Sequence, residues 1–206
     1  MLQNSNNSSS FNNFEYLDEV PYRVFEYLLT NTSEQAENFW KCIKYADKDC
    51  LSKPNLTIKE KKDLIWTGQQ NQEDYSLFNK PLVGDSVFTA NQMVQIRLYE
   101  YQTVPTTRLD ALILYELDIY TNERANGLYN DRGIWVERTT FLKNSCLLPL
   151  LNGVDLGIGY NFLSFDREKS RGSQAIMNIG NSKSFYGISM LLALQYSNVD
   201  VGGTCG

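Results

Sequence analysis

The chain of 206 residues has 42% apolar and 21% charged residues, which is the composition of a globular domain large enough to bury a core. Its net charge of −5 argues against a general nucleic-acid-binding protein, because such proteins carry a basic excess. It contains no histidine, which excludes Ser-His and Cys-His nucleophile pairs, histidine acid–base chemistry and histidine-containing zinc sites.

The two ends of the chain differ in composition from the rest. Residues 1–14, MLQNSNNSSSFNNF, have too little apolar surface to fold alone and lack the basic and apolar regions of a secretory signal. We predict an extended Asn/Ser-rich arm at 1–14, a single domain at 15–198 and a flexible tail at 199–206. No apolar run approaches the roughly 18 residues of a membrane span, so we expect the protein in the cytoplasm where it is made.

Apolar residues at helical spacing predict the first two helices. The first covers residues 18–29, with Pro21 tolerated in its first turn. In the second, NTSEQAENFWKCIKYAD, Thr32 and Gln35 have the spacing of a capping box. The apolar stripe of the second helix consists of Ala36, Phe39, Trp40 and Ile43. We expect this stripe to pack against the sheet face that carries Ile113, Leu117 and Leu192.

The stretch KYADKDCLSKPNLTIKEKKDLIW reads as a helix end, a rigid turn and a new helix start. Pro54 and Asn55 form the turn, and Thr57 and Glu60 have the spacing of a second capping box. Apolar anchors for this third helix are Ile58, Leu64 and Ile65. Its first turn is basic, which opposes the helix dipole. Its lysines are therefore candidates for contact with a partner, with a solvated helix face as the alternative: Lys59, Lys61 and Lys62.

Apolar and polar residues that alternate with a period of two predict the first strands. A short strand at 76–78 is followed by strands at 91–104 and 109–123, and Pro105 and Thr106 between them indicate an antiparallel pair. The inward residues are Val94, Ile96, Leu98, Ile113, Tyr115, Leu117 and Ile119. The outward residues are Gln95, Arg97, Tyr99, Glu116 and Asp118.

The C-terminal half completes an α+β fold. Residues 122–133 predict an exposed loop, and residues 134–153 predict a helix that Pro149 ends or kinks. Leu142, Cys146, Leu147 and Leu150 lie along one side of that helix. Further strands are predicted at 157–166, 175–180 and 184–199. The order ααα-ββ-α-ββ predicts a mostly antiparallel sheet packed by helices.

Few residues are candidates for catalysis. Glu116 and Asp118 share one strand face, where they are candidates to bind a divalent ion in a phosphohydrolase or nuclease; charges for solubility or for a partner are the alternative. There is no P-loop, and Gly157-Ile158-Gly159 is not part of a G-x-G-x-x-G motif. The four cysteines, Cys42, Cys50, Cys146 and Cys205, form no C-x-x-C pair and predict free thiols. We therefore expect no enzyme, no catalytic residue, no metal and no cofactor.

Several residues instead predict contacts with other proteins. The basic loop residues Arg167, Lys169 and Arg171 are candidates to contact phosphates or an acidic neighbour, with a solvated hairpin tip as the alternative. Phe11 and Phe14 are the apolar anchors of the arm. Tyrosines are favoured at protein interfaces, and several fall on outward faces or in loops: Tyr99, Tyr101, Tyr120 and Tyr129. An interaction protein is therefore favoured over an enzyme.

Two segments resemble a family of tailed-bacteriophage neck proteins. In FWKCIKYADKDCLSKPNLTIKEKKDLIW, an aromatic helix ending in Lys-Tyr runs into the turn pattern Asp-x-Leu-x-x-Pro-x-Leu-Thr and then a lysine-rich helix, as in that family. The later RTTFLKNSCLLPLLNGVDLGIGYNFLSFD resembles a second segment of the same family. The element order is similar to that of tail-terminator and related head–tail connector folds. The resemblance covers residues 15–198 and departs at the arm and at Cys42 and Cys146, which stand at usually aliphatic positions.

This resemblance implies a structural virion protein that forms a closed ring in the phage neck and joins the tail to the head around the DNA channel. It implies a tail terminator, typically sixfold, or alternatively a head-completion or adaptor ring on the portal, typically twelvefold for adaptors. The implied partners are copies of itself, neighbouring neck, portal or tail-tube proteins, and DNA that passes without sequence-specific binding; no membrane is involved. The implied location is the virion, and the host cytoplasm during assembly. A cytosolic adaptor unrelated to phage is a further alternative.

Overall fold

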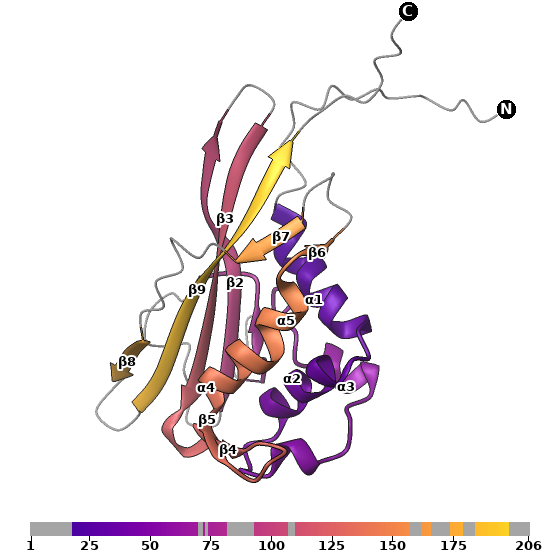
Figure 1. Cartoon of the computed structure of the whole chain (residues 1–206), viewed down its shortest axis with the longest axis vertical. Helices are drawn as coiled ribbons and strands as arrows, with labels where there is room; N and C mark the ends of the chain where they lie inside the picture. Colours follow the sequence, from indigo (N-terminus) through magenta and orange to yellow (C-terminus); the bar gives the residue numbers. More distant parts are fainter. Residues whose placement is uncertain are drawn as a thin grey trace, which may run out of the picture.

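A computed structural model describes residues 18–69, 72, 74–81, 93–106, 110–156, 162–165, 174–178 and 184–197. Within them the fold is α+β, with a mostly antiparallel, curled sheet whose one face is covered by helices, as the sequence predicts (Figure 1). The predicted arm at 1–14 and tail at 199–206 lie outside the described residues. So do five of the candidate interface residues: Phe11, Phe14, Arg167, Lys169 and Arg171.

Three long strands form the centre of the sheet. They are β2 (Val94–Pro105), β3 (Asp110–Asn122) and β9 (Ser184–Ser197), in the sheet order β1-β2-β3-β9-β7-β6. The predicted antiparallel pairing of β2 with β3 is confirmed, with a bulge between Glu100 and Gln102. The remaining strands are β1 (Leu77–Phe78), which runs parallel to β2, β6 (Val154–Asp155), β7 (Phe162–Phe165) and β8 (Gln174–Asn178), which pairs with β9.

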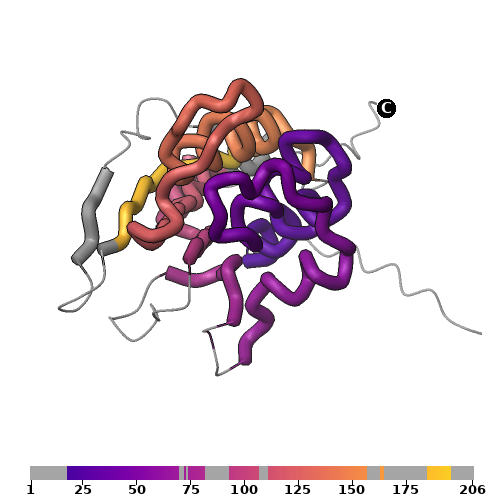
Figure 2. The backbone as a smooth tube through the Cα atoms, turned by 90° about the horizontal axis from the view of Figure 1, so that it is seen from below, coloured from indigo at the N-terminus to yellow at the C-terminus, as the bar shows by residue number. Residues whose placement is uncertain are grey.

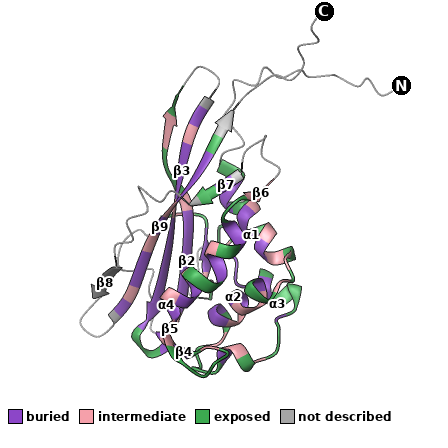
Figure 3. Cartoon of the chain, in the orientation of Figure 1, coloured by how far each residue is buried: buried purple, intermediate pink, exposed green. Residues whose placement is uncertain are grey.

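The inner face of the sheet carries the hydrophobic core. The strand register places Ile96 opposite Ile119 and Leu117 opposite Met190, so apolar residues two apart line one face. Figure 3 shows buried residues running along β3 and β9 beneath the helices. The predicted inward residues of β2 and β3 are all buried.

The N-terminal helices are α1 (Val20–Thr30), α2 (Glu34–Lys44) and α3 (Ile58–Lys62), with a 3₁₀ turn, η2 (Cys50–Ser52), between the last two. The predicted stripe of α2 is buried in the same core cluster as Ile113, Leu117 and Leu192, as expected. The Trp40 indole N–H donates a hydrogen bond to the Leu28 carbonyl at 2.9 Å, which ties α2 to α1. The predicted cap at Thr32 is wrong, because Ser33 caps α2 by accepting the Ala36 N–H.

The C-terminal helix runs from Arg138 to Leu151 and packs beside α2 (Figure 2). It consists of α4 (Arg138–Phe141), a π-helical segment (Leu142–Leu147) and α5 (Leu148–Leu151). Pro149 does not end the helix, which continues to Leu151, and the regular α-helical pattern is interrupted before it by the π-helical segment, whose wider turns accommodate the proline ring and its missing N–H. Gly153, with φ of 82°, follows its end as predicted.

Residues 122–133 are not one exposed loop, which corrects the prediction. Glu123–Ala125 form a 3₁₀ turn, and Gly127–Tyr129 (β4) pair with Trp135–Glu137 (β5) in a separate antiparallel hairpin. Leu128 of this hairpin is buried in the core. Of the Asn and Gly residues in this segment, Asn130 and Gly133 form the turn of the hairpin.

Candidate interaction surfaces

The connection between α2 and α3 is fixed by Arg138. Its guanidinium, fully buried, donates from Nε to the Ala125 carbonyl at 2.6 Å. The other four hydrogen bonds go to the carbonyls of Cys42 (2.7 Å), Tyr45 (2.7 Å), Ala46 (3.1 Å) and Asp47 (2.9 Å). We call this set the Arg138 clamp. It uses all five N–H donors of the side chain and places a cation at the negative C-terminal end of α2, which compensates its buried charge.

Of the three candidate lysines, Lys61 does not contact a partner. It is 3% exposed, and its Nζ lies 2.7 Å from Glu37 Oε1 of α2 and over the Trp40 ring. The prediction is therefore wrong for Lys61, because its side chain is buried against Glu37 and Trp40 of α2. Lys59 and Lys62 are exposed. The Thr57–Glu60 capping box is confirmed, whereas Ile58, expected as an apolar anchor, is exposed.

A cysteine pair lies inside the α2–η2 connection. Cys42 and Cys50 are buried free thiols whose sulfurs are 3.8 Å apart, and Cys146 is also free and buried. The hydrogen bond from Cys42, helped by the nearby Arg138 guanidinium, lowers the pKa of Cys50 to about 7. The same hydrogen bond, together with burial, raises the pKa of Cys42. All three thiols belong to the packing around the Arg138 clamp.

The outer face of the sheet is more buried than the alternation predicted. Arg97 is fully buried rather than outward: its Nε and Nη2 bind Gln95 Oε1, its Nη1 binds the carbonyls of Lys80 and Pro81, and its guanidinium lies 4.3 Å from the Phe78 ring centroid. Burial lowers the pKa of Arg97 to about 10. Period-two alternation identifies opposite faces of a strand, but it does not show that β1 and residues 80–81 cover the second face.

Next to Arg97, five side chains form what we call the outer-face cluster: Tyr99, Glu116, Asp118, Tyr120 and Ser189. The Tyr99 hydroxyl lies 3.0 Å from Glu116 Oε2 and 3.1 Å from Asp118 Oδ2. Tyr120 donates to Asp118 at 3.1 Å, and Ser189 donates to Glu116 at 2.6 Å. Burial raises the pKa of Asp118. The expectation of an exposed side chain is therefore wrong for Tyr120, whereas Tyr99 is half-buried and Tyr101 is exposed as expected.

This cluster determines what the two carboxylates can do. Their oxygens accept hydrogen bonds from hydroxyl groups, and a divalent ion would have to displace those donors. Among the described residues, no group of three or more His, Cys, Asp or Glu side chains is placed to hold a metal ion. The geometry favours a structural role for Glu116 and Asp118.

One exposed apolar surface lies on the β4–β5 hairpin, away from the sheet (Figure 3). Its large exposed side chains are Tyr129, Ile134 and Trp135. Asn130 Oδ1 accepts the N–H groups of Arg132 and Ile134, and Gly133 adopts φ of 69°, so the hairpin turn is internally fixed. Of these residues the sequence had indicated only Tyr129; Ile134 and Trp135 had been assigned to a helix.

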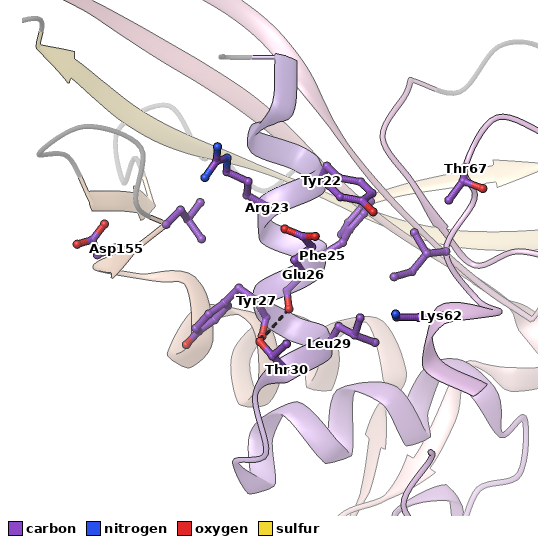
Figure 4. Close-up of a pocket in the computed structure, with 12 residues that line it drawn as sticks. Tyr22, Arg23, Phe25, Glu26, Tyr27, Leu29, Thr30, Lys62, Thr67 and Asp155 are labelled. Atoms are coloured by element: carbon purple, nitrogen blue, oxygen red, sulfur yellow. Dashed lines mark hydrogen bonds between the residues drawn. The ribbon is translucent and has the colours of Figure 1, made fainter. Parts of the chain in front are cut away.

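A second candidate surface is a groove of about 680 Å³ along the outer side of α1 (Figure 4). On one side of α1 lie Lys62 and Thr67, and on the other lies Asp155. Tyr22, which is 49% exposed, stands in it. The other lining residues are Arg23, Phe25, Glu26, Tyr27, Leu29, Thr30, Ile65 and Leu156. We call this the α1 groove; of the candidate interface residues it contains Lys62.

Comparison with models of known protein families and with curated proteins gives no match. In the described part of the chain, no helix is long and apolar enough to cross a membrane.

Proposed function

We propose that the protein is a structural virion protein that forms a closed ring of identical subunits in the neck of a tailed phage. In this proposal it is the tail terminator, joining tail to head around the DNA channel, and it acts by contacts rather than by catalysis. The main support is the Arg138 clamp, which fixes the α2–α3 connection at the cost of a buried cation. A ring subunit needs such fixed geometry, because small errors in pose accumulate around a closed ring.

The distribution of exposed apolar side chains also supports an interaction protein. Large apolar side chains are exposed on the internally fixed β4–β5 hairpin and in the α1 groove. Rigid exposed aromatic residues are favoured at protein interfaces, because little side-chain entropy is lost on binding. The net charge of −5 is compatible with a lumen through which DNA slides without being held.

The alternative within this class is a head-completion or adaptor ring attached to the portal. The resemblance links terminators to sixfold rings and portal-attached adaptors to twelvefold rings. The number of subunits therefore separates the two.

The test is native mass spectrometry of the purified chain at rising concentration, together with negative-stain electron microscopy. The proposal predicts a discrete large species with a central hole, of six subunits for a terminator. A twelve-subunit ring would favour the adaptor. A chain that stays monomeric at every concentration, and also with purified tail-tube or portal protein added, would contradict the proposal.

The rival of another class is a metal-dependent phosphohydrolase or nuclease that uses Glu116 and Asp118. The hydroxyl donors that occupy both carboxylates weigh against it. Hydrolysis of DNA or a phosphate ester that requires Mg²⁺ or Mn²⁺ and is abolished by Asp118→Asn would support this rival. We expect no such activity.

A further inference from the structure

The α1 groove takes no part in the Arg138 clamp or the outer-face cluster. We propose that it binds the N-terminal arm, residues 1–14, of a second copy of this chain, with Phe11 and Phe14 as the apolar anchors. This inference rests on the proposed ring, since it names one contact between neighbouring subunits.

The chemistry of the groove defines what it can accept. Its partly exposed apolar surface comes from Tyr22, Tyr27, Leu29 and Leu156, and it carries charges of both signs, from Arg23, Glu26, Lys62 and Asp155. Charges of both signs do not select a strongly charged ligand. A neutral segment with large apolar side chains fits best.

One polar atom in the groove also needs a partner. Arg23 Nη2 donates to Glu19 at 3.1 Å, whereas Arg23 Nε is shielded from solvent and has no hydrogen-bond acceptor among the described residues. A buried donor without an acceptor costs free energy, and a backbone carbonyl or an amide side chain supplied by a ligand would remove that cost.

The arm has the matching composition. MLQNSNNSSSFNNF carries no charged side chain, and its Asn, Ser and backbone groups offer many acceptors for Arg23. Its two phenylalanines are three residues apart, near the domain. Without a surface to cover them, these rings would stand in water on a segment that buries little else.

The start of α1 indicates that the groove receives the arm of another copy rather than its own. Asp18 and Glu19 continue the helix as a 3₁₀ turn, and Glu19 has φ of −83° and ψ of −16°, so the chain enters α1 along the helix axis. The groove extends the other way, from Tyr22 towards Thr30. Residues 14–19, FEYLDE, contain no Gly or Pro to reverse the direction.

The arm is also long enough to reach a neighbouring subunit. An extended chain spans up to about 3.6 Å per residue, so Phe14 and Phe11, which precede Asp18 by four and seven residues, reach up to about 14 Å and 25 Å from it. Helix α1, with 11 residues, is about 16 Å long.

The test is a cross-link between two full-length copies that carry different C-terminal tags. Both carry Cys205→Ser; one adds Asn13→Cys, which keeps both phenylalanine anchors, and the other adds Lys62→Cys, in the groove. The remaining cysteines, Cys42, Cys50 and Cys146, are buried. We expect the co-expressed copies to form a disulfide between chains on mild oxidation, at least tenfold more than when Lys62→Cys is replaced by Lys48→Cys, an exposed lysine outside the groove.

The outcomes separate this inference from the proposed function. Rings that form without the Asn13–Lys62 cross-link would overturn the arm contact and leave the ring proposal standing. A chain that carries both Asn13→Cys and Lys62→Cys and closes an internal link as a monomer would also overturn it, because the arm would then fold on its own domain. Absence of both rings and cross-link would overturn both proposals.

A second measurement uses deletion of residues 1–13. We expect the thermal midpoint of the domain to stay nearly unchanged, because residues 1–13 have too few apolar side chains to contribute much to a core, while assembly weakens at least tenfold. Equal assembly by the truncated protein would overturn the arm contact.

Discussion

The Arg138 clamp and the α1 groove both involve the N-terminal helices, but they differ in whether their polar groups have hydrogen-bond partners. In the clamp, every guanidinium N–H has a carbonyl acceptor, and the adjoining Lys61 pairs with Glu37. In the groove, Arg23 Nε has no acceptor among the described residues and Tyr22 is half exposed. At the clamp, where the sequence has strong turn and capping signals, the polar groups are hydrogen-bonded within the chain. At the groove, where such signals are weak, the surface is better suited to bind a ligand.

Replacing Arg138 should have the largest effect, because it destroys the clamp. In Arg138→Met, five backbone carbonyls each lose a hydrogen-bond donor, and we expect the free energy of unfolding to fall by about 5 kcal/mol or the chain not to fold. Arg132→Met, on the exposed hairpin turn, is the matched control and should change the free energy of unfolding by less than about 0.5 kcal/mol. Similar values for both variants in urea unfolding would contradict the clamp.

Trp40→Ala tests the packing of α2 on the core. Trp40 is fully buried and its indole N–H binds Leu28, so we expect a loss of about 3–5 kcal/mol in the free energy of unfolding. Trp135→Ala removes an exposed indole and should cost less than about 1 kcal/mol. If the two substitutions lower the free energy of unfolding equally in thermal or chemical denaturation, the assignment of Trp40 to the buried face of α2 is wrong.

Lys59 and Lys61 are two positions apart on α3, and the first is exposed whereas the second is buried. Replacing each tests this difference in burial. Lys61→Met leaves the Glu37 carboxylate buried without its cation, and we expect a loss of about 3 kcal/mol. Lys59→Met should be nearly neutral. In the double variant Lys61→Met/Glu37→Met, more than half of the loss should return, because two apolar side chains replace the ion pair. No recovery in the double variant would indicate that the pair does not interact.

The pattern of right and wrong predictions follows from the range of each signal. The capping box of Thr57 and Glu60 and the stripe with Trp40 are local, and the structure has both. The role of Arg138 is not predictable from spacing, because its acceptors include backbone carbonyls 91 to 96 residues away in the chain.

Local sequence patterns do not predict the burial of charged residues, for a related reason. Lys61 and Arg97 look solvent-facing in any local pattern, and their burial depends on a second element that packs over them. In the same way, the β4–β5 hairpin was read as a loop and the start of a helix, because Asn and Gly mark both loops and hairpin turns.

In the satisfaction of its polar groups, the outer-face cluster lies between the clamp and the groove. Asp118 accepts hydrogen bonds, but burial still raises its pKa. The folded state therefore binds a proton more readily than the unfolded state, whose Asp pKa is about 3.9. Asp118 weakens the fold above its raised pKa, and this penalty disappears as the pH falls below the unfolded value. We expect the stability of Asp118→Asn relative to wild type to be higher at pH 7 than at pH 4. A relative loss at pH 7 in paired denaturation curves would contradict the assigned burial.

The smallest effect on stability is expected in the groove. Tyr22→Asp should change the free energy of unfolding by less than about 0.5 kcal/mol, because Tyr22 is 49% exposed on α1. It should nevertheless lower the yield of the Asn13–Lys62 cross-link at least tenfold. Tyr129→Asp is the matched control, 46% exposed on the hairpin, and should leave that yield unchanged. Equal yields for the two variants would remove Tyr22 from the contact.

The location of the chain in a phage particle tests the central claim most directly. Gold-labelled antibody against this chain, applied to purified particles of a tailed phage that encodes it and viewed by negative-stain electron microscopy, should mark one narrow band between head and tail. Label spread over the capsid or along the tail, or particles that contain none of the chain by mass spectrometry, would contradict the account.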